Sequence, residues 1–200
     1  MTSKDPQKKE ERLPPGQAPI KRLLRWGIDH PGIARETPKI DLETYTLTVD
    51  GEVQKPLKLT WNDVLKLPKV KSTSNFHCVE GWSVLNCEWE GIRFREVASL
   101  ARPKDAASFV TFECADGYTT SLSLQELSGD DVLLAYALDG KPLEEGFGFP
   151  LRLAIPDKYG YKSALWITHI KFKSKKELGY WEKKGYSDTA DIWKNDRFTR

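Results

Sequence analysis

The interpretation of this chain depends most on residues 74–83, which read Ser74-Asn75-Phe76-His77-Cys78-Val79-Glu80-Gly81-Trp82-Ser83. A cysteine that follows a strand-like approach and precedes a glycine, among polar and aromatic neighbours, suits a reactive thiolate or a soft-metal ligand. The alternative is a small buried hydrophobic residue, which is the usual role of a free cysteine. His77 gives Cys78 little support as a thiolate, because neighbouring residues of a strand point to opposite faces.

The sequence is also compatible in part with other kinds of site. Four residues carry the ligand atoms that zinc prefers: His77, Cys78, Cys87 and Cys114. They show no CxxC or HxxxH spacing, so a structural zinc site is not favoured. A cysteine–histidine hydrolase pair of Cys78 with His30 or His169 stays open, because such partners meet only in the folded chain. No GxGxxG or GxxxxGK[ST] motif occurs, which argues against dinucleotide and P-loop sites.

A second dense segment is residues 146–156, Gly146-Phe147-Gly148-Phe149-Pro150-Leu151-Arg152-Leu153-Ala154-Ile155-Pro156. An arginine inside an apolar strand is costly unless it pairs with a carboxylate or a bound anion such as phosphate. Glycines in this segment and at Gly160 allow backbone amides to approach a ligand closely. The alternative is a packed strand in which Arg152 pairs with Asp157 or Glu145.

Composition limits the protein class. The chain has 200 residues, 39% of them hydrophobic and 30% charged, which suits a globular protein with its own core. Lys and Arg number 31 against 29 Asp and Glu, which is too balanced to favour a nucleic-acid partner. Three cysteines form no even-numbered disulfide framework. With no signal peptide and no apolar run approaching about 18 residues, we expect a cytoplasmic protein without a membrane span.

Periodicity predicts short strands and few helices. Alternating residues predict strands at 45–49, 109–114, 118–124, 131–138, 151–155 and 165–172. Thr60 with Asp63 predicts the start of a short helix that Pro68 stops, and residues 92–101 predict a second helix. The sequence therefore predicts an α+β fold with mixed, largely antiparallel sheets and short helices. We expect residues 1–15 to form a flexible polar tail and residues 16–200 a single domain.

Seven segments, in the same order, resemble the molybdopterin-binding domain of the sulfite oxidase family. They are 12–17 (RLPPGQ), 76–83 (FHCVEGWS), 89–91 (WEG), 133–136 (LLAY), 148–152 (GFPLR), 159–163 (YGYKS) and 179–186 (GYWEKKGY). The Cys-Val-Glu-x-Trp-Ser version is similar to the bacterial methionine-sulfoxide-reducing branch and to small sulfite-oxidase-like oxidoreductases. The resemblance implies that fold, an enzyme, and a molybdenum-molybdopterin (Mo-MPT) cofactor.

The resemblance also implies roles for individual residues. Cys78 matches the molybdenum ligand, and Tyr186 matches a tyrosine beside the metal that could donate to a substrate oxygen. The remaining positions match residues that hold the pterin: Asp29, His30, Cys114, Phe147, Arg152, Lys162, Ser163, Ala164 and Leu165. Phe147 and Leu165 depart from the usual histidine or asparagine and the usual lysine.

Two departures bear on the substrate. Ser83 and Ile28 stand where sulfite oxidase has arginines that hold the sulfite dianion. Each lost charge-assisted bond is worth about 1.5–3 kcal/mol, so a neutral sulfoxide-like substrate is favoured over sulfite. The prediction is oxygen-atom transfer on a small substrate, most simply sulfoxide reduction. The alternatives are sulfite oxidation and a non-catalytic pterin-binding module.

The resemblance implies a separate partner for electrons. The chain shows neither the haem domain nor the dimerisation domain of sulfite oxidase, so we expect a separate electron-transfer protein. Residues 171–176 (KFKSKK) could dock an acidic redox partner, or could be the solvated end of a strand.

Overall fold

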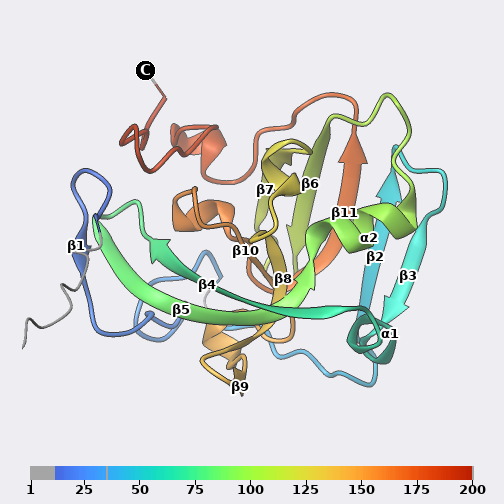
Figure 1. Cartoon of the computed structure of the whole chain (residues 1–200), viewed down its shortest axis with the longest axis horizontal. Coiled ribbons are helices and arrows are strands. Elements are labelled where there is room, and N and C mark those ends of the chain that lie inside the picture. The colour runs from blue at the N-terminus through green and yellow to red at the C-terminus, as the bar shows by residue number, and fades with distance from the viewer. Residues whose placement is uncertain (1–11, 35, 200) are drawn as a thin grey trace, which may run out of the picture.

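Two β-sheets form the framework, as the computed structural model of residues 12–34 and 36–199 shows (Figure 1). The first sheet has six strands: β1 (Ala18–Pro19), β4 (Lys69–His77), β5 (Trp82–Arg93), β8 (Leu133–Leu138), β9 (Lys141–Pro142) and β10 (Arg152–Ala154). The second has five, in the order β3 (Leu57–Thr60), β2 (Thr46–Gly51), β11 (Ile167–Lys173), β6 (Phe109–Cys114) and β7 (Thr119–Ser123). Only β1–β5 and β2–β11 pair in parallel among these strands. The predicted mixed, largely antiparallel α+β fold is confirmed.

Helices are short, as the sequence predicts. They are α1 (Trp61–Leu65) and α2 (Phe94–Ala101), with single 3₁₀ turns η1 (Glu126–Ser128), η2 (Glu145–Phe147), η3 (Gly160–Lys162) and η4 (Glu182–Lys184). None of the described helices combines the length and the apolar character needed to cross a membrane. Residues 1–11 of the predicted tail 1–15 lie outside the described part of the chain.

The core fills the space between the two sheets and α2. Buried side chains from β2, β6 and β11 meet others from β5, β8 and β10, including Leu47, Phe112, Phe172, Ile92 and Leu134. The neighbours of Leu134 on β8 point to the other face of the first sheet and join a second buried cluster with Phe76, Cys78 and Trp89. The first sheet is therefore buried on both faces. Cys78 belongs to the cluster on the face that points away from the second sheet.

The long hairpin β4–β5 is the main feature that periodicity missed. The helix predicted at 92–101 begins at Phe94, because β5 continues through Ile92 in register with Leu134 of β8. The register of the β5–β8 pairing shifts between Glu90 and Gly91. The close approach of the two strands there requires glycine at position 91, because a side chain would meet the Leu134 carbonyl oxygen at 2.2 Å. In Figure 1 the hairpin sweeps across the molecule, and its turn lies on the same side as β1.

The predicted start of α1 is confirmed in atomic detail. The Thr60 hydroxyl accepts a hydrogen bond from the Asp63 amide, and the Asp63 carboxylate accepts one from the Thr60 amide. This reciprocal pair satisfies two amides that a helix start leaves unpaired.

Thr60→Ala is expected to lower the free energy of unfolding by about 1 kcal/mol, because the amide of Asp63 loses its acceptor. Urea denaturation measures the change. Thr60→Ser keeps the hydroxyl and should remain close to the wild type; equal losses in both variants would contradict the capping role.

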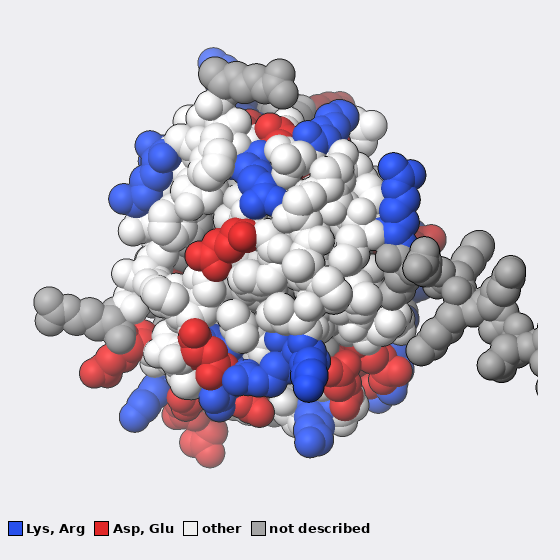
Figure 2. Space-filling view, turned by 90° about the vertical axis from the view of Figure 1, so that its left-hand side faces the viewer, with Lys and Arg blue, Asp and Glu red and all other residues white. Residues whose placement is uncertain are grey.

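Charge is mixed on the side of the molecule where β1 and the β4–β5 turn lie. Figure 2 shows this side with a largely uncharged middle and with Lys and Arg interspersed among Asp and Glu along its lower part. No concentrated basic patch of the kind that binds nucleic acid is visible on the described part of this face.

Candidate active site

A tight turn between β4 and β5 presents Cys78. The Cys78 amide donates to the Trp82 carbonyl at 2.8 Å, and the Gly81 amide donates back to the Cys78 carbonyl at 3.1 Å. Gly81 has φ = 102°, a conformation that favours glycine over other residues. The Cys-Val-Glu-Gly-Trp segment therefore folds locally into a hairpin turn with its cysteine at the entry.

Segments from both ends of the chain hold this turn. Gln17, just before β1, donates its side-chain amide to the Cys78 carbonyl at 3.0 Å. Arg197 donates to the Val79 carbonyl at 2.6 Å and to the Gly16 carbonyl at 2.9 Å. The position of Cys78 thus depends on contacts between parts of the chain that are distant in sequence.

A cavity of about 240 Å³ opens beside Cys78. It is lined by Trp26, His30, Pro31, Gly32, Ile33, Cys78, Val79, Glu80, Asp116, Tyr118, Gly160, Tyr161, Ser163, Leu165, Trp166, Trp181 and Tyr186. Two carboxylates, and no lysine or arginine, belong to this lining among the described residues. The cavity walls are otherwise largely aromatic and apolar.

Burial disfavours ionisation of the Cys78 thiol. Its side chain is 6% exposed, and burial raises the pKa of Cys78 to about 12. The sulfur donates to Glu80 Oε2 across 4.0 Å. A thiol held protonated is a poor nucleophile for hydrolysis, whereas a metal displaces the proton and binds the thiolate.

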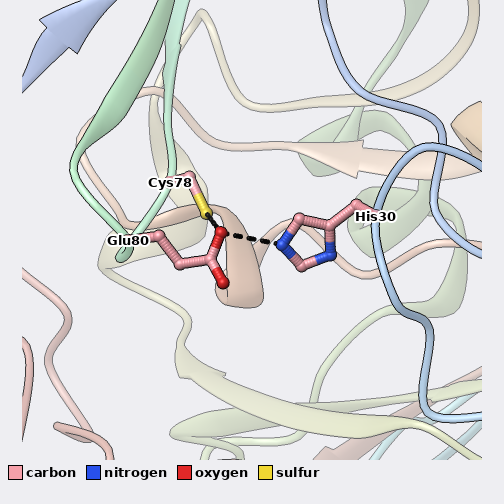
Figure 3. Close-up of side chains that lie close together, drawn as sticks. All are labelled: His30, Cys78 and Glu80. Carbon is pink, nitrogen blue, oxygen red and sulfur yellow. Dashed lines mark hydrogen bonds and ion pairs between the residues drawn. The ribbon is translucent and has the colours of Figure 1, made fainter.

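His30 and Glu80 stand beside Cys78 and point toward it (Figure 3). His30 Nε2 lies 2.9 Å from Glu80 Oε2, and the Trp82 indole donates to the same oxygen at 3.2 Å. Burial opposes ionisation of Glu80, but the hydrogen bonds from His30 and Trp82 prevail and lower its pKa. An ionised carboxylate therefore lies next to the cysteine.

Tyr186 lies in the same cavity, held by aromatic rings. Its ring centroid is 5.5 Å from that of Tyr161, 5.1 Å from Trp181 and 5.2 Å from Phe198. Among residues 12–34 and 36–199, no group bonds to its hydroxyl, which leaves that hydroxyl free to donate to a ligand.

Arg152 on β10 is a fully buried cation with unused donors. Its guanidinium stacks on Trp89 at 4.8 Å and on Phe76 at 5.6 Å, and Nη1 donates to the Phe147 carbonyl at 3.1 Å. Nε and Nη2 have no partner in the described part of the chain, and burial lowers the pKa of Arg152 to about 10. Neither Asp157 nor Glu145, proposed above as alternatives, pairs with it. Buried donors without partners indicate an anionic ligand.

Comparison with known proteins identifies the family. The oxidoreductase molybdopterin binding domain family matches residues 34–181, most of the chain. The chain belongs to this family. It is therefore an oxidoreductase, and the resemblance drawn from the seven segments is confirmed.

Two relatives and one solved structure place the chain more closely. It is 40% identical over 159 residues to the oxidoreductase YuiH of Bacillus subtilis, covering 80% of each protein. It is 31% identical over 157 residues to the protein-methionine-sulfoxide reductase catalytic subunit MsrP of Campylobacter jejuni, covering 70% of this chain and 52% of that one. It thus spans about half the length of MsrP. The sulfane dehydrogenase SoxCD of Paracoccus pantotrophus shares the fold, with a TM-score of 0.66 and 23% identity over 70% of this chain and 41% of that one.

The structure brings some of the expected site residues to the cavity and places others behind it. His30, Cys78, Ser163, Leu165 and Tyr186 line the cavity. The other expected residues lie outside the lining: Asp29, Cys114, Phe147, Arg152, Lys162 and Ala164.

The expected residues outside the lining have other contacts. Asp29 accepts hydrogen bonds from Arg25 and Arg22, which hold its pKa well below the usual range. Cys114 lies in the core between the sheets, where burial raises its pKa. Phe147 supplies the carbonyl that accepts from Arg152.

Lys162 contacts other protein groups rather than the cavity. Its fully buried ammonium pairs with the buried Glu182 carboxylate and donates to the Ser121 carbonyl at 3.1 Å. Burial lowers the pKa of Lys162, and Glu182 partly offsets this. Glu182 follows Trp181 in the segment that carries Tyr186, so the pair fastens that segment to the body of the protein.

Lys162→Met is expected to lower the free energy of unfolding by about 3–5 kcal/mol, because the Glu182 carboxylate would remain buried without its partner. Urea denaturation measures the loss. The double variant Lys162→Met/Glu182→Gln should recover part of it, and additive losses would contradict the pairing.

The two acidic residues of the cavity, Glu80 and Asp116, have no role predicted from the sequence. Asp116 accepts from the Tyr118 amide at 3.0 Å, and burial raises its pKa. An acidic residue in a turn is usually exposed to solvent, so the sequence gives no sign that these two side chains line a cavity. Only the folded chain shows it.

The structure does not form the alternative zinc site of His77, Cys78, Cys87 and Cys114. His77 bonds to Ser83 Oγ at 2.7 Å, and Cys87 and Cys114 lie in different buried clusters, so the four zinc candidates do not gather. His169 lies between Asp50 and Glu113, on β2 and β6. Of the two possible histidine partners, only His30 lies near Cys78.

The basic run 171–176 is largely neutralised. Lys171 pairs with Glu113 at 2.7 Å, Lys173 with Glu177 at 2.9 Å, and Lys176 with Asp188 at 2.7 Å. These partners favour the solvated strand end over a dedicated docking patch for an acidic protein.

Proposed function

We propose that this enzyme reduces a neutral sulfoxide at the cavity beside Cys78. The observation that carries the proposal is the charge of the lining, which has Glu80 and Asp116 but no described lysine or arginine. The Glu80 carboxylate lies 4.0 Å from the Cys78 sulfur, where it would repel a sulfite dianion. A sulfoxide carries no net charge and avoids this repulsion. The printed name of the MsrP relative supports the same substrate class.

The residues present fit a molybdenum-pterin cofactor. The cavity lining includes a thiol, which suits a soft metal, and Arg152 has two unpartnered nitrogens and stacks on the Phe76 ring. Gly160 approaches the same ring so closely that a side chain there would meet it at 2.2 Å. When bound, the cofactor supplies two-electron oxygen-atom transfer. In this proposal Cys78 holds the metal and Arg152 holds the pterin phosphate.

The chain's own groups then handle the substrate. Sulfoxide reduction consumes two electrons and two protons and yields a sulfide and water. The free Tyr186 hydroxyl donates a hydrogen bond to the sulfoxide oxygen and orients it. Trp26, Trp166 and Trp181 exclude water and contact the apolar groups of the substrate. A separate electron-transfer protein supplies the electrons.

The experiment measures cofactor and turnover in the same preparation. Protein purified from molybdate-sufficient cells should contain molybdenum and pterin in equal amounts, close to one per chain. With reduced viologen as the donor, it should reduce methionine sulfoxide or dimethyl sulfoxide. Sulfite oxidation by the same sample should be far slower. Folded protein without molybdenum and pterin would overturn the proposal, and faster sulfite oxidation would overturn the substrate assignment.

A further inference from the structure

Three groups of different chemistry converge at the cavity mouth. His30 comes from the segment after β1, whereas Cys78 and Glu80 come from the β4–β5 turn (Figure 3). A ligand atom from each, the imidazole nitrogen, the sulfur and a carboxylate oxygen, lies within 4.8 Å of the other two. Among the described residues, no other group of three histidine, cysteine or acidic side chains meets this condition.

We infer that His30, Cys78 and Glu80 bind Zn²⁺ when the chain lacks its pterin cofactor. Histidine nitrogen, thiolate and carboxylate are the three ligand types that zinc takes in proteins. Three protein ligands with an open fourth position are typical of a catalytic zinc site rather than a structural one. The fourth position here faces the cavity, where a water molecule can enter.

The contacts of His30 aim its Nε2 at the other two ligand atoms. Nδ1 lies 3.0 Å from the Pro31 carbonyl, which can only accept a hydrogen bond. Nε2 lies 2.9 Å from Glu80 Oε2, the oxygen that also faces the Cys78 sulfur. A metal ion at this point would have a nitrogen, an oxygen and a sulfur within reach.

The surroundings orient the ligands as in a metal site. A carbonyl that accepts from Nδ1 directs Nε2 toward the metal, which is the usual arrangement for a zinc-bound histidine. The Trp82 indole bonds to Glu80, and Gln17 and Arg197 hold the turn that carries both Cys78 and Glu80. The backbone of the turn that carries Cys78 and Glu80 is thus held before a metal arrives, which lowers the cost of binding.

The distances require only small movements. Zinc bonds of about 2.0–2.3 Å imply ligand atoms roughly 3.3–3.8 Å apart in a tetrahedron. The His30–Glu80 distance must open from 2.9 Å, and the Cys78–Glu80 distance must close from 4.0 Å. The Glu80 side chain is 55% exposed, so it can adjust without repacking the core.

Zinc and the cofactor metal would share one ligand, the Cys78 thiolate. Zinc at Cys78 would occupy the position assigned to the cofactor metal, and must leave before the cofactor can load. This consequence rests on the proposed function, whereas zinc binding itself does not. A host that cannot make the pterin cofactor provides chain in which zinc binding is measured alone.

The test uses the full chain from such a host, stripped of metal and confirmed as folded by circular dichroism. Zn²⁺ should bind one per chain in calorimetry. Co²⁺, as a spectroscopic substitute, should give a thiolate-to-metal charge-transfer band and the intense visible bands of a tetrahedral site. His30→Ala and Glu80→Gln should each weaken Zn²⁺ binding about 10- to 100-fold, as loss of an orienting or ligating group does.

Matched variants act as controls. His169→Gln and Glu88→Gln remove a histidine and a glutamate far from the cavity mouth, and should bind Zn²⁺ like the wild type. If His30→Ala does not fold, His30→Gln replaces it. A missing thiolate–cobalt band, or unchanged Zn²⁺ affinity in the folded His30 and Glu80 variants, would overturn the assignment. Neither result depends on whether the loaded enzyme reduces sulfoxides.

Discussion

Cys78→Ser is expected to reduce sulfoxide turnover by at least about 1,000-fold, with loss of bound molybdenum. The expected size is that of removing a group in direct contact with the reacting centre. A serine hydroxyl is a harder and much weaker acid than a thiol, so it does not replace the thiolate as a soft-metal ligand. Metal analysis and the viologen-coupled assay measure the two effects on the same sample.

Structural damage must be separated from loss of the ligand. Serine is nearly the same size as cysteine, and its hydroxyl can still donate to Glu80, so the midpoint of urea unfolding should change little. Cys87→Ala is the matched control, because Cys87 is buried in the same cluster but lies outside the cavity lining. A Cys78→Ser enzyme with wild-type turnover would contradict the assignment even if cofactor were bound.

Local patterns were sufficient for four of the five strands of the second sheet, whereas β3 (Leu57–Thr60) was not predicted. The alternation of Thr46, Leu47, Thr48 and Val49 predicts β2, and the structure buries Leu47 and Val49 completely. The capping residues of α1 are equally local. Such elements follow from contacts between residues close in sequence, which periodicity detects.

The β4–β5 hairpin could not be predicted in this way. Strand β4 has few large apolar residues, and it is fixed by pairing with β5 along its whole length. β5 is in turn extended to Arg93 by β8, some 40 residues away in sequence. Asn86, with φ = 56°, interrupts the alternation that would have indicated a strand.

The candidate site also has residues that could be predicted from the sequence and residues that could not. Cys78, Tyr186 and Arg152 could be selected from the sequence because a resemblance gave them roles. The acidic character of the cavity could not, since Glu80 and Asp116 come from separate turns and only the fold brings them to one cavity. The charge of the lining is the feature that most directly bears on the substrate.

Arg152→Met is expected to separate stability from cofactor binding. Desolvation lowers the pKa of Arg152 to about 10, a shift that corresponds to about 3 kcal/mol against the charged form. Methionine removes this cost but loses the stacking on Trp89 and the bond to Phe147. Replacing buried charges with apolar residues is often neutral or stabilising, so the free energy of unfolding should stay the same or increase in the cofactor-free chain.

Cofactor affinity should change in the opposite direction. If Nε and Nη2 each make a charge-assisted bond of about 1.5–3 kcal/mol to the pterin phosphate, their loss weakens binding by about 10²- to 10⁴-fold. Pterin content after purification, and urea denaturation of chain from the cofactor-deficient host, measure the two quantities. Arg152→Lys keeps the charge but not the two donors, and should retain part of the pterin. A methionine variant that unfolds more readily, or that keeps its full pterin content, would show that Arg152 is a structural residue rather than a ligand of the pterin phosphate.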